Sequence, residues 1–261
     1  MHRHLTLKKS QRFLVDKHYI NRIVESGNIN ENDTVLEIGP GSGTLTSALL
    51  ATNCSVIAIE KDFELYNFLV ENQKHPRLKL VYGDALKIDF PPFNKVVSNL
   101  PYYISTPITF KILNYKFDVA VLMYQYDFAV RLVAQPGEEN YSRLTLAFAR
   151  DYDVELLFKV PRTCFRPQPK VDSAVVRIRP VNEKFTVIDE SLYQTLIDLG
   201  FQHRRKKLAT IIKHFQDKFK LDDIQLKTVL DSCSALDKRI EVLAPREIAE
   251  VADMLFKVKN N

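Results

Sequence analysis

Apolar runs and cysteines are both scarce in this 261-residue chain, and each scarcity excludes a class of protein. No run of about 18 uncharged apolar residues occurs, and no apolar signal core follows the basic N-terminus, so we expect neither a membrane span nor secretion. The three cysteines, Cys54, Cys164 and Cys233, are odd in number and far apart. They predict free thiols in a reducing compartment, and therefore a cytoplasmic protein without a metal site.

Glycine is scarce as well, with 7 residues against 12 prolines, so most glycines are expected where the backbone needs one. Three of them fall together, at positions 39, 41 and 43. With 46% apolar and 26% charged residues, the composition excludes a disordered chain and a coiled-coil rod. The net charge of +5 allows a polyanionic partner without requiring one.

From Thr34 onward, short apolar runs rich in β-branched residues alternate with amphipathic stretches of helical period, which predicts a parallel sheet covered by helices. The expected strands are 34–38, 55–59, 78–82, 95–98 and 119–124, and the expected helices are 44–51, 63–72, 106–114 and 128–134. Beyond Pro136, residues 144–150, 154–160 and 173–178 resemble strands without intervening helices. The predicted fold class is therefore α/β, a Rossmann-like sheet with an antiparallel edge.

The strand signals stop after Pro180. Residues 192–215, 222–232 and 245–258 carry helical periodicity, and Pro245 suits a first helical turn. We place a domain boundary near residue 182, which divides the chain into a sheet domain, 1–182, with a basic N-terminal arm, and a small all-helical domain, 183–261.

The segment from Thr34 to Thr44 predicts a strand, a glycine-rich turn and a helix N-terminus that a ligand can approach closely. A dinucleotide fingerprint would require glycine where Thr44 stands, and Glu37 would repel a pyrophosphate. The turn therefore suits the zwitterionic tail of an amino acid better, although a tight turn with nothing bound is the competing explanation.

Two further carboxylates stand where successive strands should end. Glu60, about 20 residues beyond the glycine turn, is placed to accept both hydroxyls of a ribose. Asp84 can accept a hydrogen bond from an exocyclic adenine amine, with the backbone of Ala85 nearby. Either residue alone would more often be a capping carboxylate. The ordered series of glycine turn, Glu60 and Asp84 describes S-adenosylmethionine.

The tetrapeptide Asn99-Leu100-Pro101-Tyr102 follows the fourth predicted strand. An enzyme that methylates a base amino group must hold acceptors around the nitrogen, because the nitrogen lone pair is delocalised into the ring. The side-chain carbonyl of Asn99 and the main-chain carbonyl of Leu100 can serve, while Pro101 stiffens the turn and Tyr102 offers a stacking surface for a flipped base. An Asn-x-Pro turn with a core tyrosine is the alternative.

Together, six segments resemble the small-subunit ribosomal RNA adenine dimethyltransferase family over nearly the whole chain: Ser10–Leu14, Glu37–Gly43, Gly83–Ala85, Asn99–Pro107, Phe165–Val176 and Phe201–Leu208. Residues 123–129 look like its archaeal and eukaryotic branch. The resemblance implies methyl transfer from S-adenosylmethionine to N6 of two adjacent adenosines in the 3′-terminal hairpin of small-subunit rRNA, within an assembling ribosomal subunit. We expect a monomer by default, with neither a metal nor a membrane as partner.

The resemblance also assigns residues to roles. Phe165 would cover the face of the flipped adenine opposite Tyr102, with a core aromatic as the competing explanation. The cofactor-binding residues would be Gln11, Arg12, Leu14, Glu37, Gly39, Gly41, Glu60, Lys61, Asp84, Ala85 and Asn99. The first motif departs from the family pattern, since Ser10 and Arg12 replace the usual glycine and asparagine. Arg12 could therefore face cofactor or RNA phosphate.

Cations gather in two segments, the N-terminal arm with Lys8 and Lys9, and residues 203–207, which we expect within the first C-terminal helix. The predicted RNA-binding residues are Lys8, Lys9, His203, Arg204, Arg205, Lys206 and Lys207. For Lys206 and Lys207, a merely solvated helical face is an equally good interpretation. Two other functions stay open: a macrolide-resistance type of enzyme acting on large-subunit rRNA, and a non-catalytic assembly factor that binds immature rRNA.

Overall fold

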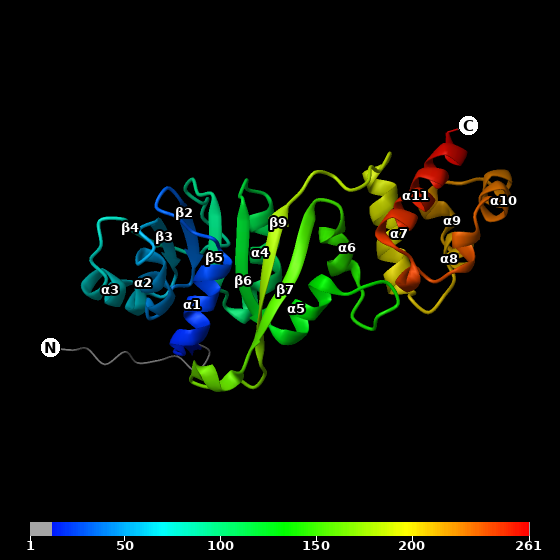
Figure 1. Cartoon of the computed structure of the whole chain (residues 1–261). Helices are drawn as coiled ribbons and strands as arrows, with labels where there is room; N and C mark the ends of the chain where they lie inside the picture. The colour runs from blue at the N-terminus through cyan, green and yellow to red at the C-terminus, as the bar shows by residue number, and fades with distance from the viewer. Residues whose placement is uncertain (1–11, 261) are drawn as a thin grey trace. The chain divides into compact units, whose positions relative to one another are not determined.

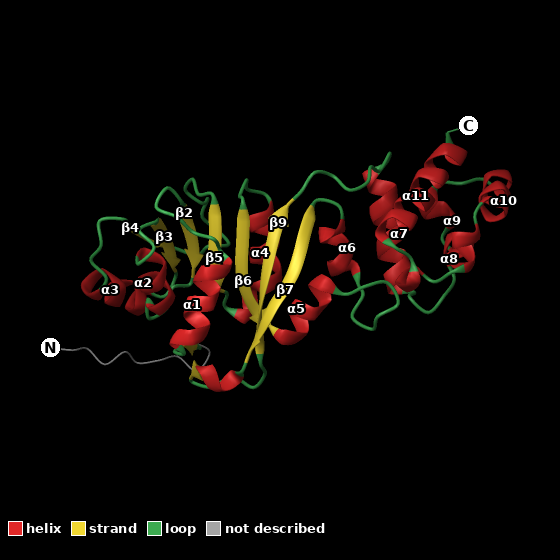
Figure 2. Ribbon diagram, in the orientation of Figure 1, coloured by secondary structure: helices red, strands yellow, loops and turns green. Residues whose placement is uncertain are grey.

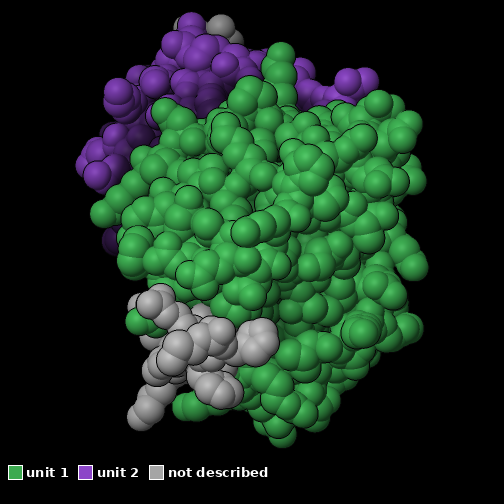
Figure 3. Space-filling model, turned by 90° about the vertical axis from the view of Figure 1, so that its left-hand side faces the viewer, with its two compact units in different colours: residues 1–129, 153–180 green, residues 130–152, 181–261 purple. Residues whose placement is uncertain are grey.

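The computed structural model describes residues 12–260, which form two compact units (Figure 3). Unit 1 contains residues 12–129 and 153–180, and unit 2 contains residues 130–152 and 181–260. The C-terminal segment of unit 2 begins at residue 181, two residues before the domain boundary that the sequence predicted, which began the helical domain at residue 183. That division placed residues 130–152 in the first domain, whereas they pack with the C-terminal helices: Tyr141 and Leu146 belong to the same buried cluster as Leu196 and Leu255.

Unit 1 is built on a seven-stranded sheet with the order β4-β3-β2-β5-β6-β9-β7 (Figures 1 and 2). Its strands are β2 (Thr34–Ile38), β3 (Ser55–Glu60), β4 (Leu78–Tyr82), β5 (Lys95–Asn99), β6 (Val119–Gln125), β7 (Tyr152–Val160) and β9 (Ser173–Pro180). The pairs from β4 to β6 are parallel, and β9 runs antiparallel to β6. The predicted parallel sheet with an antiparallel edge is thus confirmed.

The central strands are buried on both faces, as parallel strands covered by helices must be. Val35 and Leu36 point to opposite faces of β2, and both are fully buried. The helices of this part of the chain are α1 (Lys17–Ser26), α2 (Thr44–Leu50), α3 (Phe63–Asn72), α4 (Ser105–Leu113) and α5 (Tyr126–Val133), with the 3₁₀ turns η1 (Tyr102–Ile104) and η2 (Arg162–Cys164). The short strand β1 (Phe13–Leu14) pairs with β8 (Phe165–Arg166). Sequence periodicity missed α1, although Asp16 caps it by accepting the His18 N–H at 2.9 Å.

Unit 2 is helical, and two sequence-based predictions for it were wrong. Residues 144–150 form a helix, α6 (Arg143–Ala149), because an apolar run of this length fits a buried helix as well as a strand. Residues 192–215 form two helices, α7 (Glu190–Gln202) and α8 (Leu208–His214), rather than one. The remaining elements are α9 (Gln216–Phe219), α10 (Asp223–Ser232), η3 (Ser234–Asp237), η4 (Ile240–Val242) and α11 (Pro245–Lys259). Within residues 12–260, no helix is both long and apolar enough to cross a membrane.

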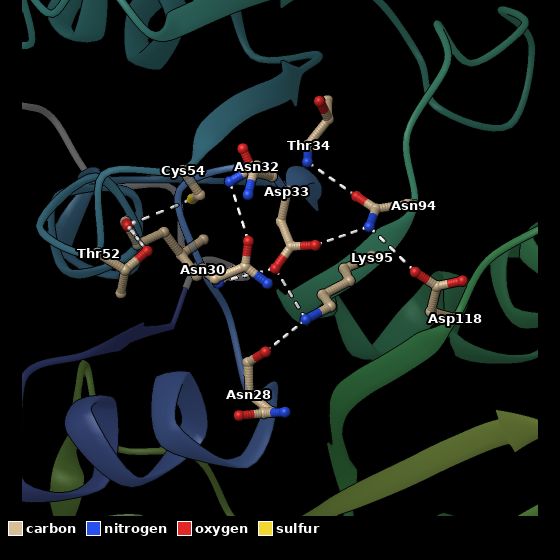
Figure 4. A network of polar contacts seen from close by, with 11 residues as sticks. Asn28, Asn30, Asn32, Asp33, Thr34, Thr52, Cys54, Asn94, Lys95 and Asp118 are labelled. Atoms are coloured by element: carbon tan, nitrogen blue, oxygen red, sulfur yellow. Dashed lines mark hydrogen bonds and ion pairs between the residues drawn. The ribbon is translucent and has the colours of Figure 1, made fainter.

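A buried polar network ties the amino ends of β2 and β5 together (Figure 4). The Lys95 ammonium lies 2.8 Å from Asp33 Oδ2, and the two side chains are only 9% and 6% exposed. Asn94 Nδ2 donates to Asp33 Oδ1 at 2.7 Å, while Asn94 Oδ1 accepts the Thr34 N–H at 2.8 Å. Lys95 also donates to the carbonyl of Asn28, which follows α1. These bonds fix the register of two adjacent strands and the helix before them.

We expect Asp33→Asn to lower the free energy of unfolding at pH 7 by about 3 kcal/mol, because it leaves the buried Lys95 ammonium without a counter-charge. Burial would raise the pKa of Asp33, but hydrogen bonds from Lys95, Asn30 and Asn94 outweigh it and hold the pKa below its ordinary value. The contribution of Asp33 is therefore present at neutral pH and is lost as the pH falls through that lowered pKa. Urea denaturation at pH 7 and pH 3 measures both effects.

Asp118→Asn is the matched control, because Asp118 is exposed and accepts only the second Asn94 N–H, at 3.0 Å. It should lower the free energy of unfolding by less than about 1 kcal/mol. Equal losses in the two variants would show that the buried ion pair contributes no more than a surface contact.

Candidate active site

A cavity of about 780 Å³ opens in unit 1 at the carboxyl ends of β2, β3, β4 and β5. From β2 the chain continues to β3 and β4 on one side of the sheet, whereas β5 and β6 lie on the other side. A crevice forms at the carboxyl ends of the strands where the strand order reverses in this way. The cavity gathers most of the predicted site residues: Arg12, Leu14, Glu37, Gly39, Gly41, Glu60, Lys61, Asp84, Ala85, Asn99, Leu100, Pro101 and Tyr102. Gln11, Lys8 and Lys9 lie outside the described residues.

The glycine turn between β2 and α2 needs its glycines for shape and for space. Gly41 has a φ of +59°, a left-handed conformation that strains other residues. A Cβ atom there would lie 2.7 Å from Cε1 of Phe13, which also lines the cavity. Gly39 packs against the Pro101 ring, 3.2 Å from where its own Cβ would stand. The turn therefore touches the β5 end of the site directly.

Glu37 is the most deeply buried carboxylate of the cavity. It is 2% exposed, and its Oε2 accepts a 2.6 Å hydrogen bond from Thr46 Oγ1 of α2. Burial raises the pKa of Glu37 to about 8, with a contribution from the nearby Glu60, although the Thr46 hydrogen bond opposes the rise. At neutral pH the side chain is therefore mostly protonated unless a positive charge comes close. Thr46 was not recognisable as a site residue from sequence.

The other two carboxylates are held by backbone N–H groups. Glu60 accepts from Asp62 at 2.8 Å and from Gly41 at 3.2 Å, and burial raises its pKa. These two bonds orient the carboxylate toward the glycine turn. Asp84 is half-buried, accepts from the Leu86 N–H at 3.0 Å and lies 3.7 Å from the Lys61 ammonium. Each carboxylate is thus positioned by the turn that follows its strand.

Asn99 ends β5, and the next three residues bend away from it into η1. Its half-buried side chain lines the cavity and makes no hydrogen bond with another described residue. The Tyr102 hydroxyl lies 2.6 Å from Ser173 Oγ at the start of β9, which fixes the ring at the cavity wall. Burial raises the pKa of Tyr102, and the Ser173 hydrogen bond and the charge of Arg12 oppose this rise. The tyrosine is therefore a neutral flat surface beside a free amide.

Ser98 supports the site without lining it. The parallel ladder between β2 and β5 is formed at Val35 and Leu36, and the strands then diverge toward the cavity. The fully buried Ser98 hydroxyl spans the gap by donating to the Ile38 carbonyl at 2.7 Å and accepting the Ile38 N–H at 3.3 Å. Sequence reasoning missed Ser98, because a single serine at the end of an apolar strand carries no recognisable signal.

Two predictions from the sequence need correction: the stacking role of Phe165 and the helical position of residues 203–207. Phe165 is fully buried in the apolar cluster that contains Val160 and Val175, and it does not line the cavity, so the structure gives the competing core position rather than an exposed stacking face. The physical reason is its pairing with Leu14 in the β1–β8 ladder, which holds it inward.

Residues 203–207 lie in a turn rather than in a helix, because Lys207 pairs with Arg239 in an antiparallel bridge and Leu208 donates to the Lys238 carbonyl at 2.9 Å. Arg204 is ion-paired with Glu241 at 2.6 Å, and Lys207 with Asp237 at 3.2 Å. Arg205 and Lys206 are exposed and form no ion pair with another described residue. No cluster of acidic, histidine or cysteine side chains suited to a metal ion occurs between residues 12 and 260.

Known proteins resemble the chain over nearly its full length. The family model of ribosomal RNA adenine dimethylase matches residues 4–243. Probable ribosomal RNA small subunit methyltransferases A from Methanosarcina acetivorans and Thermococcus onnurineus are each 45% identical over 253 residues, covering 96% of this chain and 93% and 92% of theirs. A dimethyladenosine transferase from Plasmodium falciparum is similar in structure, with a TM-score of 0.82, 29% identity and coverage of 95% and 98%. The 23S rRNA methyltransferase ErmE is also similar in structure, with a TM-score of 0.72, 26% identity and coverage of 95% of this chain and 100% of its own. The chain belongs to the ribosomal RNA adenine dimethylase family.

Proposed function

We propose that this protein transfers methyl groups from S-adenosylmethionine to N6 of two adjacent adenosines in the 3′-terminal hairpin of small-subunit rRNA, within an assembling subunit. The observation that carries the proposal is the convergence, in one cavity, of a glycine turn, three carboxylates and the unpaired amide of Asn99. The archaeal relatives named for the small subunit support the choice of target.

The residues of the cavity fit S-adenosylmethionine. Its volume of about 780 Å³ lies within the range of small-molecule sites. Glu37 beside the glycine turn suits the ammonium group of the amino-acid tail, Glu60 suits the ribose hydroxyls, and Asp84 with the Ala85 backbone suits the adenine edge. When bound, this cofactor supplies an electrophilic methyl group.

The catalytic step then depends on how Asn99 and Tyr102 hold the target base. The Asn99 carbonyl oxygen accepts a hydrogen bond from the adenine amino group, which draws the nitrogen lone pair out of conjugation and toward the methyl group. The Leu100 carbonyl is a second acceptor, and the Tyr102 ring stacks on the base. Methyl transfer to this nitrogen depends on orientation and exclusion of water more than on a strong general base. Arg12 lines the same cavity.

Two other functions are less well supported. ErmE acts on 23S rRNA and shares the fold, but its 26% identity is well below the 45% of the small-subunit relatives. A non-catalytic assembly factor would not need an intact cofactor cavity next to a free asparagine amide. Unit 2 could still hold the protein on a ribosomal particle, since its exposed Arg205 and Lys206 suit phosphate contacts.

Incubation with labelled S-adenosylmethionine and ribosomal subunits that lack the modification tests the proposal directly. Label is expected on small subunits only, and mass mapping should place it on two adjacent adenosines near the 3′ end of the rRNA. Label confined to large subunits would move the protein to the ErmE type of activity. No label on either subunit would favour the binding factor.

Asn99→Ala should lower kcat by about 10² to 10³, because it removes an acceptor that acts on the reacting nitrogen. The Kd for S-adenosylmethionine should change by less than about threefold, since the carboxylates and the glycine turn remain. Single-turnover methylation and calorimetric binding measure the two quantities. Asn114→Ala, at the exposed C-cap of α4, is the matched control and should leave both unchanged. A variant that loses binding and turnover equally would mean that Asn99 mainly holds the cofactor.

Cofactor binding at pH 7 should release close to one proton. With its pKa raised to about 8, Glu37 is mostly protonated before binding, and the ammonium group of the ligand favours the carboxylate. Calorimetry in buffers of different ionisation enthalpy counts the protons. Glu37→Gln should abolish the release and weaken binding, whereas Glu64→Gln, on the exposed first turn of α3, should do neither. The same proton count in wild type and Glu37→Gln would assign the release to another group.

A further inference from the structure

A second basic surface lies in unit 1, outside the two cationic segments described from the sequence. Between Glu155 and Asp172 the chain has no acidic residue and four basic ones, Lys159, Arg162, Arg166 and Lys170. Residues 161–170, which we name the basic connection, link β7 to β9 and carry the last three of these. A local excess of this kind raises the positive potential of the surface and favours contact with a negative partner.

The three cations of the basic connection are exposed and none forms an ion pair with another described residue, although the charge of Arg162 acts on the Asp172 carboxylate and contributes to holding the pKa of Asp172 below its ordinary value. Arg162 Nη1 donates to the Lys170 carbonyl at 3.1 Å, and Arg166 Nη1 donates to the carbonyls of Thr163 and Phe165 at 3.1 and 2.9 Å. Bonds to carbonyls orient the guanidinium groups and leave their charge intact, with further N–H donors still available. Lys159 differs, because its ammonium is ion-paired with Asp172 at 2.7 Å.

The basic connection is fixed to the wall of the catalytic cavity at its middle and just beyond its C-terminal end. In the middle, Arg166 pairs with Phe13 and Phe165 with Leu14, and both β1 residues line the cavity. Three residues beyond the C-terminal end, Ser173 holds the Tyr102 hydroxyl at 2.6 Å. The Arg162 N–H also donates to Asp172 Oδ1 at 2.9 Å, which closes the connection on itself. The three cations are therefore held in place beside the residues that hold the base.

A base that leaves its stack to enter an active-site pocket remains joined to the RNA backbone, so the phosphates on either side of it must lie near the mouth of that pocket. We propose that Arg162, Arg166 and Lys170 form a phosphate-binding surface that receives the RNA backbone of the nucleotides flanking the methylated adenosine. The inference rests on the proposed function for the identity of the RNA. Independently of the cations of residues 203–207, unit 1 positions RNA through these three side chains.

The test compares RNA binding of the wild type with that of the triple variant Arg162→Gln, Arg166→Gln and Lys170→Gln. The probe is a synthetic RNA hairpin with two adjacent adenosines in its loop, and its Kd is measured at several salt concentrations. Three lost phosphate contacts should flatten the slope of log Kd against log salt by about 2 to 3 and weaken binding by roughly 10-fold to 100-fold at low salt. The Kd for S-adenosylmethionine should stay within about threefold, which also shows that the variant is folded.

Arg77→Gln is the matched control. Arg77 is exposed, and its guanidinium likewise donates to main-chain carbonyls, those of Glu31 and Asn53, but it precedes β4 at the opposite end of the strands from the cavity. This variant loses one positive charge, as each single change in the triple variant does, and should keep the wild-type slope. The double variant Arg162→Lys and Arg166→Lys keeps the charge and should also keep most of the slope.

The outcomes separate this proposal from the proposed function. If the wild type methylates small subunits and the triple variant keeps the wild-type salt slope, the phosphate surface is wrong and the function stands. If the wild type methylates neither subunit but the triple variant still flattens the slope while Arg77→Gln does not, the surface stands and the function is wrong. An equal loss of slope in Arg77→Gln would reduce the effect to net charge and overturn the surface.

Discussion

The pairing of β2 with β5 is the constraint on which the site depends, because these two strands carry Glu37 and Asn99 and must be close at one end and separate at the other. The Asp33–Lys95 pair and Asn94 hold the amino ends together, within 2.8 Å and 2.7 Å contacts. Toward the carboxyl ends the Ser98 hydroxyl bridges the strands by its bonds with Ile38, and the crevice opens where the main-chain ladder stops. A polar group is costly to bury unless it is bonded, and each of these groups is bonded to the strand opposite.

At the carboxyl ends of the strands, the buried carboxylates have no positively charged partner within the described residues. Asp33 has its counter-charge within the fold, whereas Glu37 and Glu60 are buried with only hydroxyl and N–H partners, and burial raises both pKa values. The folded protein therefore holds two carboxylates whose ionised forms are destabilised until a cationic or hydroxyl-rich ligand arrives. Such groups are typical of functional sites, because the free energy spent on burying them is recovered in binding.

Much of the fold could be predicted from sequence, since β-branched runs flanked by amphipathic helices admit few arrangements, and the strand ends carried the polar residues that the cavity gathers. Each prediction that was wrong or missing has a specific structural cause. The run 144–150 is apolar enough for a strand or a buried helix, and only its packing in unit 2 decides. The break at 203–207 is made by partners near residue 239, far away in sequence. Thr46 and Ser98 are single hydroxyls whose importance lies in what they face, and Phe165 is turned inward by a two-residue strand that has no periodicity to detect.

The basic residues also differ in how far the fold pairs them with carboxylates. A sequence displays the density of cations but not their compensation, and residues 203–207 stand out by density alone. In the folded chain Arg204 and Lys207 are paired with Glu241 and Asp237, whereas Arg205 and Lys206 are exposed and form no ion pair with another described residue. Arg162, Arg166 and Lys170 are spaced four residues apart and do not form a run in the sequence. None of them forms an ion pair with another described residue, and strand pairing places Arg166 beside Phe13, which lines the cavity. Affinity for a polyanion depends on charge that the fold leaves unpaired, so the density of cations along a sequence is a poor guide to which of them bind phosphate.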